Sequence, residues 1–246
     1  MRRFTLCVLL CLLPLLAPAQ PADKLRAQQL SEIGSRSRLL CASALLYFDP
    51  QQRNLDPRGL TAAYYHLNSL ETLVLQLGQP AALHQPLLAL KATFSRLDRL
   101  PPGQRAAYPE LLEQLLDQQR LLLLAAVGEE GGEEGAMPAA YLLQRQSRDL
   151  PRLLLDHQLR HYPWPQARGD LLTVAQRQQI DQAVGQRFSR LEQALPEQAE
   201  ALRSIRRHYQ FVRNPLQSSA SGASGGAEFY LSRAVLDLDE LAASLP

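Results

Sequence analysis

Two histidines have the spacing in this chain that best suits metal chemistry. His157 and His161 lie four positions apart in a segment of helical character, so a helix would place both imidazoles on one face, within reach of a single ion. Two ligands do not complete a site, and a third, for instance His208, would have to come from another segment. The alternative is that the two rings pack at the rim of a helical bundle. The spacing therefore predicts a metal site only as a hypothesis that needs a third ligand.

Motifs of the common enzyme classes are missing from the sequence. The chain has no nucleophile elbow, phosphate-binding loop, dinucleotide fingerprint or paired-cysteine metal site. The Glu-x-x-His motif of di-iron bundles is also missing, because neither His66 nor His157 has a glutamate three residues earlier. We therefore expect a non-catalytic protein that carries no cofactor.

The elements that position these side chains are predicted to be helices. The chain has 246 residues, of which 46% are hydrophobic, and it contains 52 leucines against 15 valines, isoleucines and threonines. Leucine loses little rotamer freedom in a helix, whereas strands are enriched in β-branched and aromatic residues. The composition predicts an all-α fold, an antiparallel bundle of seven or eight helices, arranged as one bundle or as two in tandem.

An export signal is predicted at residues 1–19. Arg2 and Arg3 precede an apolar stretch, and Ala17-Pro18-Ala19 supplies the small residues that signal peptidase requires, so we expect cleavage before Gln20 and a periplasmic location. The apolar stretch is too short to span a bilayer, so we expect no transmembrane span after cleavage. Loss of Arg2 and Arg3 leaves equal numbers of basic and acidic residues. A nucleic-acid partner is therefore not expected, because such proteins carry a basic excess.

Breaks in the hydrophobic pattern divide the chain into parts. We expect an N-terminal helical bundle over residues 20–128, an acidic glycine-rich linker over 129–137, and a C-terminal helical part over 138–246 with a flexible tether at 218–227 before the last helix. The last helix, on Leu231, Val235 and Leu238, is predicted to dock on its own bundle or on a partner. The helix that begins near Pro109 is expected to be the most central one in the first half, and Pro151 to break or kink its helix. Cys41 is read as a small buried residue.

Residues 34–40, Gly-Ser-Arg-Ser-Arg-Leu-Leu, with flanks over 30–47, resemble the first helix of the periplasmic N-terminal sensory domains of type IV pilus chemotaxis transducers and nitrate sensor kinases. In those domains small residues precede arginine-x-arginine and a Met or Leu pair, which places Arg36 and Arg38 at the arginine positions. The resemblance implies an oxyanion site at Arg36 and Arg38, with Arg38 as the anion-binding residue. The sequence departs from the pattern at residues 41–43. The alternative is that both arginines are solvated and flank the core.

Together these observations predict an exported, non-catalytic helical protein that acts as a protein-interaction module in the bacterial envelope, through an envelope partner or self-association. That hypothesis expects an exposed apolar patch near the C-terminal helix or elsewhere in the second half, larger than the few hundred Å² that are normal for a monomer. One alternative is a free-standing sensory-type module that binds a small anion, with Arg36 or Arg38 pointing into a polar pocket or a dimer interface. Another is a metal-binding helical protein that uses His157 and His161.

Overall fold

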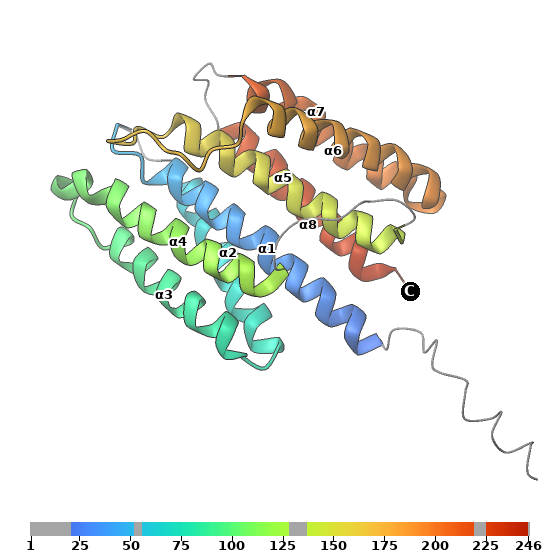
Figure 1. Ribbon diagram of the computed structural model, residues 1–246, viewed down its shortest axis with the longest axis horizontal. Coiled ribbons are helices and arrows are strands. Elements are labelled where there is room, and N and C mark those ends of the chain that lie inside the picture. Colours follow the sequence, from blue (N-terminus) through green and yellow to red (C-terminus); the bar gives the residue numbers. More distant parts are fainter. Residues whose placement is uncertain (1–20, 52–55, 128–136, 219–224, 246) are drawn as a thin grey trace, which may run out of the picture.

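The computed structural model describes residues 21–51, 56–127, 137–218 and 225–245, and within these ranges the protein is all-α (Figure 1). Eight α-helices are present there, joined in places by short 3₁₀ turns at Pro102–Ala107 and Pro196–Gln198: α1 (Pro21–Tyr47), α2 (Pro57–Gln76), α3 (Ala81–Asp98), α4 (Tyr108–Val127), α5 (Ala139–His161), α6 (Val174–Ala194), α7 (Ala199–Gln217) and α8 (Gly225–Ser244). The prediction of an all-α bundle is confirmed. The predicted signal peptide (1–19), nearly all of the predicted acidic linker (129–137) and most of the predicted tether (218–227) lie outside the described residues.

Helix ends follow from local capping chemistry. The Asp56 carboxylate accepts a hydrogen bond from the backbone N–H of Arg58 at the start of α2, where Pro57 occupies the first helical position. At the start of α6, Thr173 and Gln176 form a reciprocal capping box. Gly78, with a φ of 79°, ends the second helical segment in the left-handed conformation that glycine favours.

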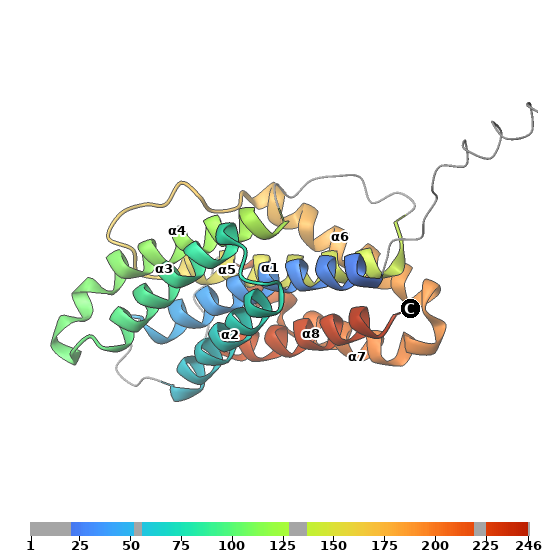
Figure 2. The same ribbon diagram turned by 90° about the horizontal axis from the view of Figure 1, so that it is seen from below.

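The first helix is the central one. Every residue of α1 from Ile33 to Leu45 is buried, and the helix packs against α2, α4, α5 and α8 (Figure 2). Small residues make this possible: a Cβ on Gly34 would lie 3.3 Å from Leu123 of α4 and 3.4 Å from Arg148 of α5. The expectation that α4 would be the most central helix of the first half is therefore wrong, because a helix enclosed on all sides shows no amphipathic stripe. Cys41, inside this stretch, is buried as predicted, and burial raises the pKa of its thiol.

The second central helix, α5, lies beside α1 and runs in the same direction. The Arg38 side chain donates to the Arg148 carbonyl, and the Tyr162 hydroxyl, just past α5, donates to the Phe48 carbonyl. The helix continues through Pro151, so the predicted break is not observed. Buried apolar residues from both halves of the chain form one continuous core, and the two halves are therefore packed as a single bundle.

The last helix docks on its own bundle, in agreement with one of the two predicted arrangements. Leu231, Val235 and Leu238 are fully buried, and α8 packs against α1, α5 and α7. The Ser43 hydroxyl of α1 also donates to the Glu228 carboxylate at 2.8 Å. None of the helices in the described ranges is both long and apolar enough to cross a bilayer.

Candidate functional site

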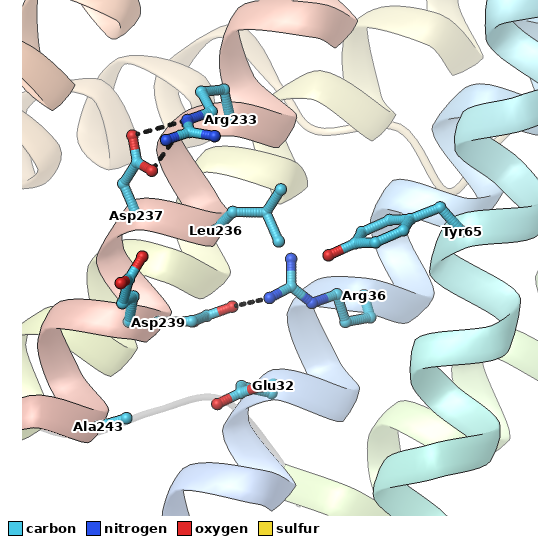
Figure 3. Close-up of a pocket in the computed structure, with 9 residues that line it drawn as sticks. Glu32, Arg36, Tyr65, Arg233, Leu236, Asp237, Asp239 and Ala243 are labelled. Carbon is cyan, nitrogen blue, oxygen red and sulfur yellow. Dashed lines mark hydrogen bonds and ion pairs between the residues drawn. The ribbon is translucent and has the colours of Figure 1, made fainter.

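A cleft of about 380 Å³ lies where α1, α2 and α8 meet (Figure 3). Helix α1 contributes two charged side chains one turn apart, Glu32 and Arg36, and α2 contributes Tyr65. The remaining lining comes from one face of α8: Arg233, Leu236, Asp237, Asp239, Glu240 and Ala243. The first and last helices of the chain thus form the opposite walls of one polar cleft.

A buried ion pair forms the floor of this cleft. Arg36 Nη2 lies 2.8 Å from Asp239 Oδ2, and the two residues are 5% and 4% exposed. The Ser147 hydroxyl of α5 donates to Oδ1 of the same carboxylate. Burial raises the pKa of Asp239 to about 7, although the charge of Arg36 acts in the opposite direction. Desolvation therefore outweighs the ion pair at this carboxylate.

The second terminal nitrogen of Arg36 is unsatisfied. Nη1 is buried and has no hydrogen-bond acceptor among the described residues. In Figure 3 the guanidinium lies with Asp239 on one side and with Leu236 and Tyr65 on the other. A buried donor without an acceptor costs roughly 1–3 kcal/mol. An acceptor supplied in the cleft would recover that energy.

The cleft carries more negative than positive charge. Its four carboxylates, on Glu32, Asp237, Asp239 and Glu240, face two arginines. Arg233 forms an ion pair with Asp237 at 3.0 Å, as Arg36 does with Asp239. Glu32 accepts a hydrogen bond from the Gln28 amide at 2.9 Å. A positively charged group is therefore favoured near Glu32 and Glu240, the two cleft carboxylates that form no ion pair among the described residues.

The two predicted arginines occupy different sites. Both are 5% exposed, so the alternative that they are solvated is wrong. Two positions on a helix differ by about 200° in direction, and Arg38 accordingly faces α5, where Nη1 donates to the Arg148 carbonyl at 3.3 Å. Arg36 alone of this pair lines the cleft.

A buried histidine lies next to the cleft residue Tyr65. His66 is 1% exposed, and neither ring nitrogen has a partner among the described residues. Burial, and secondarily the charge of Arg36, lowers the pKa of His66 to about 3. The imidazole is therefore neutral at physiological pH.

The candidate metal pair is brought together, but without a third ligand. The rings of His157 and His161 lie 4.3 Å apart between centroids, and His161 Nδ1 is hydrogen-bonded to the His157 carbonyl at 2.7 Å. His157 is buried, and burial lowers its pKa to about 4. Across the described ranges no group of three potential metal ligands is found. The metal hypothesis stays a prediction that still needs its third ligand.

Other charged residues, most of them buried, neutralise one another within the second half. Arg187 is 1% exposed and contacts both Asp149 and the Gln146 side chain. Arg213 and the Tyr209 hydroxyl both contact Asp181, at the interface of α6 and α7. None of these side chains lines the cleft, and their mutual contacts are those of a buried network that joins neighbouring helices.

A small aromatic surface lies where α7 and α8 meet, and we define it by Phe211, Phe229 and Tyr230. Phe211 and Phe229 are 68% and 65% exposed, and both rings pack against Tyr230, at centroid distances of 4.8 and 5.4 Å. His208 also contacts Tyr230. The protein-interaction hypothesis expected exposed apolar side chains in this part of the chain.

Most of the cleft was not predicted from the sequence. Arg36 was identified through its resemblance to the sensory helices, but Glu32, Tyr65, Asp239 and Glu240 were not. Asp239 had one available signal, since it follows the buried Leu238 on a helix predicted to dock. Comparison of the chain with protein-family models, with curated proteins and with solved structures gives no match.

Proposed function

We propose that the protein is an exported, non-catalytic binding module of the bacterial envelope, and that its cleft between α1, α2 and α8 receives a small polar ligand. The observation that carries the proposal is Arg36, a buried arginine that lines the cleft and has one terminal nitrogen to which no described residue offers an acceptor. Proteins rarely retain an unsatisfied buried donor at a cavity, and a bound acceptor removes its cost. The predicted export signal supports the location.

The charge of the cleft bears on the kind of ligand. The resemblance of residues 30–47 to sensory helices implies a bare oxyanion. Asp239 already neutralises Arg36, and the cleft holds two carboxylates more than it holds arginines. Repulsion from these carboxylates disfavours a ligand that is only negatively charged. The proposed ligand is therefore small and polar, but it need not be an oxyanion.

A thermal-shift screen of the mature chain tests this proposal. The panel contains nitrate, sulfate, simple amines and amino acids, each tested on the wild-type protein and on the Arg36→Met variant. A ligand that binds only the native state adds about 2.7 kcal/mol of stability at a hundredfold excess over Kd. We expect one compound class to raise the Tm of the wild-type protein and not that of the variant. Failure of every class to raise the Tm would overturn the proposal.

The second candidate function is protein interaction through the aromatic surface. Two phenylalanines that both contact Tyr230 and each expose about two thirds of their area favour it, because exposed apolar groups of this kind mark contact sites. The test is recovery of envelope proteins with the Phe211→Ser/Phe229→Ser variant. Removal of α8 is unsuitable, since it would open the core. Equal recovery with both proteins would contradict this candidate.

A further inference from the structure

We propose that the ligand of the cleft is a small molecule that carries both a carboxylate and an ammonium group, as a free amino acid does. The inference rests on the proposed function of the cleft and names the chemical class of the ligand. It follows from the unsatisfied donor on one wall, the carboxylates beside it and the size of the space.

The carboxylate of the ligand is assigned to Arg36. Asp239 forms its ion pair with Nη2 of Arg36. Nη1 of Arg36 is buried without an acceptor among the described side chains and backbone. Arginine presents its donors in a planar fork that suits carboxylate oxygens. A ligand carboxylate at Nη1 would complete the hydrogen bonding of this guanidinium.

The ammonium group of the ligand is assigned to Glu32 and Glu240. In the described part of the chain neither carboxylate forms an ion pair, whereas the other two acids of the cleft are each paired with an arginine. Glu32 lies one helical turn before Arg36, so the two side chains start about 6 Å apart on one face of α1. That spacing suits a ligand whose opposite charges are separated by a few bonds.

Tyr65 and the volume of the cleft limit the ligand further. Tyr65 is 49% exposed and closes the α2 side of the cleft. The volume of about 380 Å³ is near the lower end of small-molecule pockets, which begin at about 300 Å³. The space therefore fits a molecule of amino-acid size.

Ligands with only one kind of charge match the cleft less well. An anion would satisfy Arg36 Nη1 but would face Glu32 and Glu240, whose carboxylates form no ion pair with any described residue. A simple amine would meet those carboxylates but would leave Nη1 unsatisfied. Only a ligand with both groups satisfies Arg36 Nη1 as well as Glu32 and Glu240.

Titration calorimetry on the mature chain tests the inference with matched compounds. L-Lysine and L-alanine carry both groups, cadaverine lacks the carboxylate, and diacetyl-lysine lacks the ammonium groups. We expect at least one of the two amino acids to bind. Cadaverine, diacetyl-lysine and nitrate should bind at least about tenfold more weakly, which corresponds to a loss of about 1.4 kcal/mol in binding free energy.

Variants then locate the binding. Arg36→Met and Glu240→Gln should each weaken amino-acid binding about tenfold. Glu240 is exposed, so Glu240→Gln should fold and can test the inference even if Arg36→Met does not fold. The matched control is Glu200→Gln, an exposed carboxylate on α7 outside the cleft, which should leave the affinity unchanged.

The outcomes separate this inference from the proposed function. Binding of nitrate or cadaverine alone, lost in the Glu240→Gln or Arg36→Met variant, would overturn the inference and leave the small-ligand function standing. No heat from any compound would overturn both. Amino-acid binding with equal affinity in the wild-type protein and in both cleft variants would also overturn the inference, since the binding would then lie elsewhere.

Discussion

Arg36 of α1 and Asp239 of α8 form a buried ion pair, with 2.8 Å between Nη2 and Oδ2, that joins the first helix of the bundle to the last. The pair lies on the floor of the proposed ligand site, and the Ser147 hydroxyl of α5 donates a hydrogen bond to its carboxylate. Its charge balance therefore affects both the stability of the fold and the chemistry of the cleft.

Replacing Arg36 should destabilise the protein in a pH-dependent way. Arg36→Met leaves a buried carboxylate without its cation, and breaking such a pair costs about 3–5 kcal/mol. We expect that loss at pH 8 and a smaller one at pH 5, where a protonated Asp239 needs no counter-ion. Urea unfolding at the two pH values measures the difference. The double variant Arg36→Met/Asp239→Leu, which removes both charges, should recover much of the loss, and an equally large loss in the double variant would contradict this account.

Asp239 should make native stability fall as the pH rises. Its pKa is about 7 in the folded protein against 3.8 for the free side chain, so between these values the native state binds more protons than the unfolded state. The stabilisation of the native state by the protonated Asp239 is fully present below about pH 4 and is lost as the pH rises to about 7. Relative to Asp239→Asn, the wild-type protein should lose stability across this window. Parallel stability curves for the two proteins would show that the carboxyl does not titrate there.

His66 should have the opposite effect on the acid side. Its pKa is about 3 in the folded protein against 6.5 for the free side chain, so the unfolded state takes up a proton first as the pH falls. Stability from this group is present above about pH 6.5 and is lost towards pH 3. His66→Leu should reduce the stability lost between pH 7 and pH 4 by on the order of 3 kcal/mol. His84→Gln on α3 is the control, and an unchanged acid profile for His66→Leu would refute the prediction.

Two helical glycines should respond differently to substitution. A Cβ on Gly185 of α6 would meet no side chain and no neighbouring helix within 4 Å, so Gly185→Ala should stabilise by up to about 1 kcal/mol through helix propensity alone. At Gly34 a new side chain would meet Leu123 and Arg148, and Gly34→Leu should cost about 1–3 kcal/mol or more by overpacking. Thermal unfolding of both variants checks the contrast. Tolerance of leucine at Gly34 would mean that α1 is not closely surrounded.

Local patterns accounted for the helices but misjudged their places in the bundle. The docking stripe of α8 on Leu231, Val235 and Leu238 was read correctly, because i, i+3 and i+4 spacing reports one buried face. The same method ranked α4 as more central in the bundle than α1. Periodicity assigns faces with serines, arginines and glycine to solvent, but α1 is surrounded by four other helices and buries such faces. Pro151 was expected to break or kink its helix, whereas α5 continues through it without a break inside the core.

The sequence by itself determined the all-α class and the docking face of the last helix, because each depends on residues within a few turns of one another. Only the tertiary structure decided that Arg36 is buried, that Arg38 faces a different helix, and that Asp239 and Glu240 from the far end of the chain meet Glu32 and Arg36 in one cleft. Such contacts depend on how complete helices pack, and no local spacing encodes which distant carboxylate will neutralise a buried arginine.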